Sequence, residues 1–143
     1  MKKVIVSAFC AFFSIGMFAQ ANTANLPNTA QNFINKYFSS VTVEGVDENS
    51  KWEIWADDKY EVKLSNGIEL DFDENGNLLE IDSQNNEAVP MEALPANVRS
   101  YLMTNHADAE VIGWEMHDDE QEVELSNGVE VEFDSQGNFR KLD

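Results

Sequence analysis

The chain has 143 residues and a formal net charge of −18, with 27 acidic residues against nine lysines and arginines. A negative surplus of this size excludes nucleic acid and anionic membranes as natural partners, and favours cations, basic protein surfaces or simple solubility. Apolar residues make up 43% of the chain, which is enough for a packed core. The length suits one domain or two small fused units.

The first 21 residues have the pattern of a secretory signal peptide. Lys2 and Lys3 precede an apolar run over residues 4–18, and cleavage after Ala19 or Ala21 fits an A-x-A site. Cys10 lies inside the apolar run, so the mature chain has no cysteine for a disulfide or a thiol nucleophile. Cleavage removes two lysines and no acid, which moves the formal charge to about −20. The sequence therefore predicts a periplasmic or secreted protein that does not insert into a membrane after cleavage.

The mature chain is a duplication. Residues 61–82 align without a gap on residues 122–143, and twelve of the 22 positions are identical. With small gaps the match extends upstream, to WEIW against WEMH and to LPNTAQNFINKY against LPANVRSYLMTN. Each half reads as a Leu-Pro pair, a helix and then strands. We expect a first repeat over 22–82, a polar linker over 83–90 and a second repeat over 91–143.

One amphipathic helix is predicted in each repeat. Apolar residues recur at helical spacing, as Ala30, Phe33, Ile34 and Tyr37 in the first and as Val98, Tyr101 and Leu102 in the second. Pro27 and Pro95 suit the first helical turn, where a missing N–H has no cost. A single apolar stripe on each helix predicts that one face packs against a sheet.

The repeated LSNG motif predicts a hairpin loop. Residues 60–64 and 68–72 alternate between apolar and polar side chains, as half-buried strands do. A two-residue loop would place Val62 opposite Asp71 and mix the two faces of the sheet. A three-residue loop, Ser65-Asn66-Gly67, places Val62 opposite Leu70 and keeps the faces apart. Gly67 and its counterpart Gly128 are then required by backbone geometry rather than by chemistry.

The FDENGN and FDSQGN segments predict similar loops at 74–76 and 135–137. This register sets Phe72 against Leu78 and Phe133 against Phe139, but it leaves Ile81 and Leu142 on the opposite face. A two-residue turn at Asn75-Gly76 would correct Ile81, whereas Gln136 suits such a turn poorly. The register after this turn therefore stays open.

The same segment raises calcium as a ligand. Positions 1, 3, 5, 6, 7 and 12 of an EF-hand-like loop are occupied by Asp71, Asp73, Asn75, Gly76, Asn77 and Asp82. Strands replace the flanking helices, however, and position 12 is Asp rather than the usual Glu. The second copy matches less well, with Glu132, Asp134, Gln136, Gly137 and Asp143. We interpret the segment as a turn with incidental acids and expect neither a metal site nor a cofactor.

No constellation of residues predicts catalysis. His106 and His117 have neither the spacing of a metal pair nor that of a triad, and Ser65 and Ser126 are turn residues without a nearby base. The chain has no G-x-S-x-G, H-E-x-x-H, P-loop or dinucleotide motif. We expect a protein that is not an enzyme.

The sheet face away from the helices is the predicted binding surface. Its candidate residues are Trp55, Glu61, Lys63, Glu69, Asp71, His117, Glu122, Glu124, Glu130 and Glu132, with Glu53 and Glu115 beside them. A solvated antiparallel face accounts for this pattern equally well. As a binding surface, Trp55 would serve as an apolar anchor and the acids would steer a basic protein partner.

Together, these motifs resemble the bacterial PepSY-like proteins, which are related in fold to the beta-lactamase-inhibitor protein. The resemblance rests on the two EV.LSNG.E..FD..GN blocks and, with the helices, covers nearly the whole mature chain. It implies an α+β fold, in which two tandem α-plus-four-strand repeats form an eight-stranded antiparallel sheet with helices on one face. It also implies an exported module that binds or inhibits another protein, such as a hydrolase or peptidase. The alternative is a small-ligand or calcium-binding periplasmic module.

Overall fold

The computed structural model describes residues 23–48 and 59–143. The first repeat contains α1 (Asn28–Tyr37), β1 (Val43–Glu48), β2 (Tyr60–Leu64), β3 (Ile68–Phe72) and β4 (Leu78–Ser83). The second contains α2 (Ala96–Asn105), β5 (Val111–Met116), β6 (Glu120–Leu125), β7 (Glu130–Asp134) and β8 (Phe139–Leu142). A short 3-10 turn precedes each helix, η1 (Thr23–Asn25) and η2 (Met91–Ala93).

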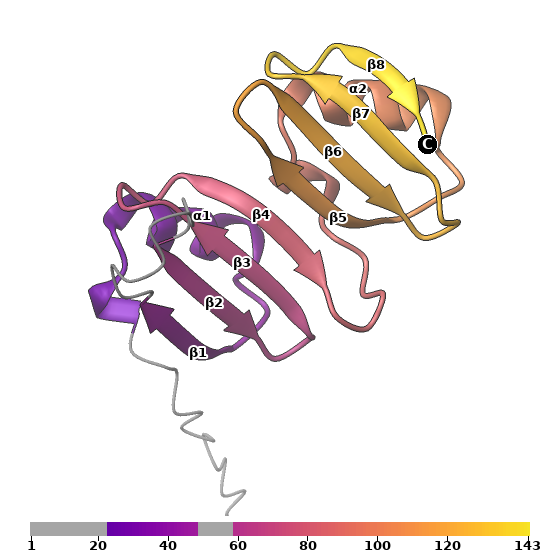
Figure 1. Cartoon of the computed structure of the whole chain (residues 1–143). Helices are drawn as coiled ribbons and strands as arrows, with labels where there is room; N and C mark the ends of the chain where they lie inside the picture. Colours follow the sequence, from indigo (N-terminus) through magenta and orange to yellow (C-terminus); the bar gives the residue numbers. More distant parts are fainter. Residues whose placement is uncertain (1–22, 49–58) are drawn as a thin grey trace, which may run out of the picture.

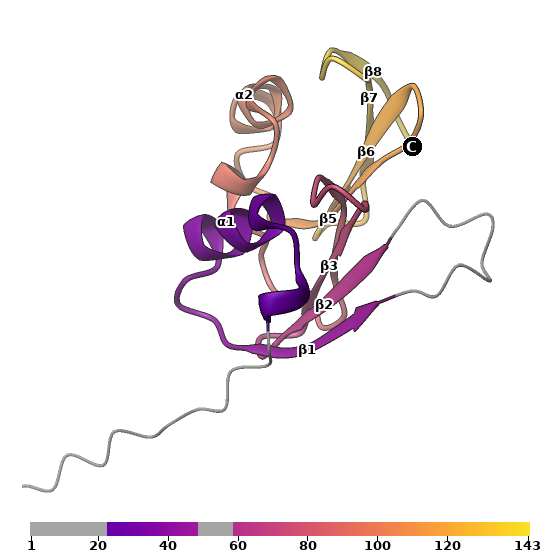
Figure 2. The same cartoon turned by 90° about the vertical axis from the view of Figure 1, so that its left-hand side faces the viewer.

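The eight strands form one antiparallel sheet in sequence order, from β1 to β8 (Figure 1). Both helices cover the same face of this sheet, and no helix of residues 23–48 and 59–143 lies on the other face (Figure 2). The two repeats are joined where β4 pairs with β5. This arrangement confirms the predicted α+β architecture.

The core lies between the helices and the covered face of the sheet. The apolar stripe of each helix meets the alternating apolar residues of the strands, as predicted. In each repeat one aromatic ring of the helix packs edge-on against a buried phenylalanine, Phe33 on Phe72 at 5.9 Å and Tyr101 on Phe133 at 5.4 Å between centroids. The buried helical residues are Ala30, Ile34, Val98 and Leu102.

The two helices begin and end in the same way, 68 positions apart. Each ends where a backbone N–H, of Phe38 or His106, donates 2.8 Å to the carbonyl four residues earlier. Pro27 and Pro95 lie at the N-cap, one position before the predicted first turn. The helix therefore begins one residue later than predicted. The proline carbonyl accepts the first helical hydrogen bond, but the proline backbone itself is extended, which makes it the N-cap.

The LSNG hairpin has the predicted three-residue loop. Val62 pairs with Leu70 and Tyr60 with Phe72, so apolar residues face apolar residues across the pair. Gly67 and Gly128 have φ of +84° and +81°, in the left-handed region that the loop requires. The register prediction is therefore confirmed.

The second turn has the predicted pairings but is followed by an irregularity. Phe72 pairs with Leu78 and Phe133 with Phe139, as expected. The register then shifts by one residue, so that Ile81 lies opposite Leu70. Ile81 is buried, and the register that the sequence left open is settled by a β-bulge at Leu79, which restores the alternation after a three-residue loop. A matching shift places Leu142 opposite Val131, although Leu142 stays exposed on the edge strand β8.

Candidate functional site

A row of carboxylates crosses the uncovered face of the sheet, which we call the outer face. One residue from each of the first seven strands lies in direct cross-strand register with the next, and Lys141 of β8 ends the series. We call these seven acids the carboxylate row: Asp47, Glu61, Asp71, Glu80, Glu115, Glu122 and Glu132. Neighbouring strands lie about 4.8 Å apart, so each acid stands beside another acid of the same sign.

A second row runs parallel to the first and is interrupted by glycine. Lys63, Glu69 and Asp82 follow one another in register across β2, β3 and β4, and Asp82 then pairs with Gly113. Gly113 pairs in turn with Glu124, which pairs with Glu130. Because Gly113 has no side chain, the outer face is hollowed there into a shallow depression of about 70 Å³. Five carboxylates line it, those of Glu80, Asp82, Glu115, Glu122 and Glu124.

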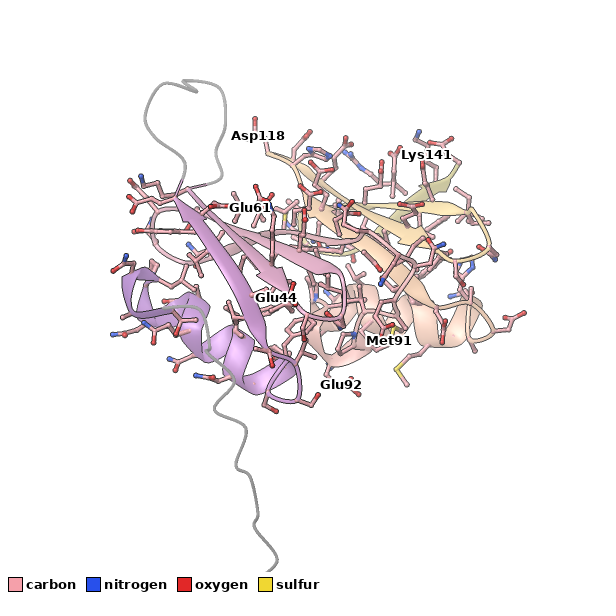
Figure 3. The ribbon with its side chains drawn as sticks, turned by 90° about the horizontal axis from the view of Figure 1, so that it is seen from below. Glu44, Glu61, Met91, Glu92, Asp118 and Lys141 are labelled. Atoms are coloured by element: carbon pink, nitrogen blue, oxygen red, sulfur yellow. The ribbon has the colours of Figure 1, made fainter. Side chains whose placement is uncertain are left out.

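One lysine forms ion pairs with acids at each end of the outer face. Lys63 Nζ lies 2.9 Å from Glu61 Oε1 and 3.7 Å from Asp47 Oδ2. At the other end, Lys141 Nζ lies 2.7 Å from Glu132 Oε1 (Figure 3, where Glu61 and Lys141 lie on the side away from the helices). The four central strands, β3 to β6, contain no lysine or arginine. Acidic side chains without a lysine or arginine on the same strands are therefore concentrated over β4, β5 and β6.

The pKa of Glu122 is raised by this environment. Partial burial raises the pKa of its carboxyl, and the neighbouring charges of Glu130, Glu115 and Glu132 raise it further. His117 opposes this effect, and its Nε2 lies 3.5 Å from Glu115 Oε2. A carboxylate with a raised pKa in a folded protein is held in an unfavourable environment, which a bound cation would relieve.

The structure places most of the predicted binding residues together on the outer face. Eight of them lie in the two cross-strand rows: Glu61, Lys63, Glu69, Asp71, Glu122, Glu124, Glu130 and Glu132. His117 follows β5 and is exposed beside Glu115. Trp55 and Glu53 lie outside the described residues. Their role in binding, like that of the whole set, stays a prediction.

Three residues of the site were missed from the sequence, Asp47, Glu80 and Asp82. The bulge at Leu79 turns Glu80 and Asp82 to the outer face, whereas the uninterrupted register had turned them toward the core. The sequence contained a sign of this, because the uninterrupted register left the apolar Ile81 on the outer face. Once Ile81 is buried, the two acids that flank it must point outward. Asp47 lies on β1, whose alternation is broken by a register shift between Val43 and Gly45.

The EF-hand-like residues do not form one site. Asp73 uses both carboxylate oxygens within its own turn, since Oδ1 accepts from the backbone N–H groups of Asn75 and Asn77, and Oδ2 from the Asn77 amide, each at 2.8 Å. Asp71 and Asp82 instead lie in β3 and β4, in register with Glu80 and Glu69. Asp134 makes the same three bonds in the second repeat. The segment acts as a turn, as interpreted from the sequence.

A buried glutamine supports the strands beneath the acidic centre. Gln121 is 1% exposed, and its Oε1 accepts a hydrogen bond of 3.0 Å from Trp114 Nε1. Its amide donates to the carbonyls of Asp134 and Ser135, at 3.3 and 3.2 Å. These bonds tie β5, β6 and the β7–β8 turn together on the core side. The carboxylates of the same strands are thereby held on the outer face.

Comparisons with known proteins identify relatives of the whole fold. Residues 19–80 and 58–141 both match the family described as "Putative beta-lactamase-inhibitor-like, PepSY-like". A comparison with curated proteins gave no match. Among the described residues, neither helix is long and apolar enough to cross a membrane.

Three solved structures from Bacteroides species are similar to this chain. One from Bacteroides thetaiotaomicron, described as a "putative calcium-regulated periplasmic protein", is 34% identical with a TM-score of 0.74, over 85% of this chain and 92% of that one. Two from Bacteroides vulgatus are a "putative periplasmic protein from DUF2874 family" at 35% and 0.73, and a "putative periplasmic protein of unknown function" at 33% and 0.69. These cover 85% of this chain and 92% and 94% of the others.

The relatives confirm the localisation expected from the sequence, since all three are described as periplasmic. The two matched regions overlap over residues 58–80 and together span residues 19–141. The chain therefore belongs to the PepSY-like, beta-lactamase-inhibitor-like family.

Proposed function

We propose that this protein is a non-enzymatic periplasmic binding module, and that the acidic centre of the outer face binds a basic surface of another protein. The carboxylate row is the observation that carries the proposal. Like charges directly opposite one another across strands destabilise a sheet, and here seven follow in succession. Local features that oppose stability are typical of functional sites.

The inhibitor-like character of the family supports a protein as the ligand. A flat face that spans several strands offers a broad contact area, and its charge would accelerate association with a basic partner. A hydrolase or peptidase whose active-site entrance carries lysines or arginines fits this chemistry. The module would act by covering that entrance.

Two variants of equal charge test the proposal. Glu122→Lys with Glu124→Lys reverses charge on the outer face, whereas Glu74→Lys with Glu87→Lys makes the same change at exposed positions in a turn and in the linker. Partners captured by the mature protein from the exported fraction of its host would be purified and titrated with all three proteins. We expect the outer-face variant to bind at least about tenfold more weakly, and wild-type affinity to fall as salt rises. Equal affinity of all three proteins would reject the outer face as the site.

Calcium is a second candidate ligand for the same face. It is favoured by the five carboxylates around Gly113 and by the relative described as calcium-regulated. As they stand, no three acidic, histidine or cysteine side chains among the described residues are arranged to hold a metal ion, so binding would require the carboxylates to turn inward. Calorimetric titration with calcium at physiological ionic strength, with Glu115→Gln plus Glu122→Gln as the comparison, decides this. The candidate fails if no heat is released and the melting temperature does not rise.

A further inference from the structure

A separate pocket lies in the second repeat, on the helix side of the sheet. It has a volume of about 370 Å³ and opens between the linker before η2, the C-terminal part of α2 and the start of β5. Met91, which lies on this side in Figure 3, forms one wall. Small-molecule sites in proteins begin at about 300 Å³. The pocket lies across the sheet from the acidic outer face, so any ligand here is additional to the proposed function.

The lining of the pocket is mostly apolar and includes two methionines. Val89, Leu102 and Val111 form the buried part, while Met91 is half-buried and Met103 is 62% exposed. An exposed methionine beside a hollow gives an adaptable apolar wall, because its side chain is unbranched and flexible. The site therefore suits an apolar group that displaces water from these surfaces.

The first repeat shows that the fold does not require this lining. From the helix to the first strand, the two repeats align 68 positions apart, with equivalent caps at Phe38 and His106 and equivalent register shifts after Val43 and Val111. Two positions that are polar in the first repeat are apolar in the second, where Met103 replaces Asn35 and Ala107 replaces Ser39, whereas His106 replaces the apolar Phe38. Val41 becomes the smaller Ala109. The second repeat thus gains an apolar rim and loses side-chain volume at the same place.

The rim carries one carboxylate, that of Glu110, where the first repeat has Thr42. The Glu110 backbone is fixed, since its N–H donates to Ser126 Oγ at 3.1 Å and its carbonyl accepts from the Ser126 N–H at 2.8 Å. Within residues 23–48 and 59–143, Glu110 takes part in no ion pair. The lining contains no lysine or arginine, its other titratable side chain is that of His106, whose ring lies 5.9 Å from the Tyr101 ring, and the protein as a whole is strongly negative. A ligand that places a positive charge beside Glu110 is therefore favoured over an anion.

We propose that this pocket binds a small organic cation, namely a primary amine that carries an aliphatic or aromatic group. The apolar group occupies the space between Met91, Met103 and Ala109, and the ammonium group lies beside the Glu110 carboxylate. The size of the hollow suits a single ring or a short branched chain.

A pair of isosteric probes tests this proposal on the mature protein. Phenethylamine and 3-phenylpropionate share one skeleton and differ in the sign of their charge. Each would be titrated at physiological salt into protein labelled at the methionine methyl groups, and followed by NMR. We expect phenethylamine to shift the Met91 and Met103 signals in a saturable manner, while Met116, outside the pocket, stays unchanged. The phenylpropionate should bind more weakly.

Variants separate this site from general attraction to an acidic protein. Glu110→Gln should weaken phenethylamine binding about two- to fivefold, as expected for an exposed ion pair, while Glu92→Gln leaves it unchanged. Met103→Asn with Ala109→Val introduces a polar residue that the first repeat has and refills the hollow, and should abolish the shifts. The proposal is overturned if the shifts do not saturate, if both probes bind equally, or if the double variant binds as the wild type does. Glu122→Gln should have no effect, which keeps this result independent of the outer face.

Discussion

Glu80 of β4 and Glu115 of β5 lie directly opposite each other in the strand pair that joins the two repeats. The next pair along the same strands is Ile81 with Trp114, both buried in the core. Apolar contact on one face of the sheet therefore holds the repeats together, while two carboxylates of like charge stand side by side on the other face. At this junction, the residues that hold the two repeats together are therefore adjacent in sequence to residues of the candidate site.

Replacing Glu122 by glutamine should stabilise the protein at neutral pH, by about 0.5 kcal/mol. The pKa of Glu122 is raised above its ordinary value of 4.5, by partial burial and then by Glu130, Glu115 and Glu132. The folded state thus binds the proton more tightly than the unfolded chain, so stability is lost as pH rises above 4.5 and through the raised pKa. Urea denaturation at pH 4 and pH 7 measures the effect.

The advantage of Glu122→Gln should be present at pH 7 and small at pH 4. Glu87→Gln, at an exposed position in the linker, is the control and should change stability little at either pH. A variant no more stable than the wild type at pH 7 would show that the carboxylate row does not oppose folding.

The turn aspartate Asp73 should stabilise the first repeat through its hydrogen bonds. Burial by itself would raise the pKa of Asp73, but the bonds donated by the Asn77 side chain, the Asn77 backbone and Asn75 outweigh it and lower the pKa. The stabilisation is present above the ordinary pKa of 3.8 and is lost as pH falls through the lowered value. We expect Asp73→Ala to cost about 1–2 kcal/mol at pH 7 by urea denaturation.

Asp73→Asn provides the comparison for this turn. Its oxygen can still accept the two backbone bonds, so it should retain part of the stability while losing the share of the pH dependence below 4 that Asp73 contributes. If the alanine and asparagine variants were equally destabilised, the bonds to the backbone would not be the cause.

A comparison of alanine variants at Gly76 and Gly128 distinguishes the cost of backbone strain from the cost of a steric clash. Both have φ of +81°, but a Cβ on Gly76 would lie 2.8 Å from Pro27 Cβ and 2.9 Å from the Ala30 backbone nitrogen, whereas nothing lies within 4 Å at Gly128. Gly128→Ala should cost about 1–2 kcal/mol for the left-handed conformation alone. Gly76→Ala should cost at least about 1 kcal/mol more, because the turn must move away from α1.

Thermal and urea unfolding of these two glycine variants test the packing of the β3–β4 turn on the helix. Equal losses would mean that the turn does not depend on contact with α1.

The parts of this fold that follow a strict period were predictable. The side-chain period of two in a strand allowed one register for the LSNG loop, and it placed Val62, Leu70 and Phe72 on the core face. The bulge at Leu79 was not predictable in the same way, because one unpaired residue changes the face of all that follow. The acidic centre of the site depends on this bulge, since it turns Glu80 and Asp82 outward. The pocket beside Met103 was also not predictable, because it depends on how the linker lies against α2.

Gln121 should be among the residues most sensitive to substitution in the second repeat. It is 1% exposed and joins Trp114 Nε1 to the carbonyls of Asp134 and Ser135. Gln121→Met keeps a similar length but leaves the buried indole N–H without its acceptor and the turn without its donor. We expect a loss of about 2–3 kcal/mol, compared with little change for Gln136→Met at an exposed position. Urea denaturation and the NMR signal of the Trp114 indole N–H report the two effects separately. A variant of unchanged stability with an unchanged indole signal would show that these bonds do not support the strands beneath the acidic centre.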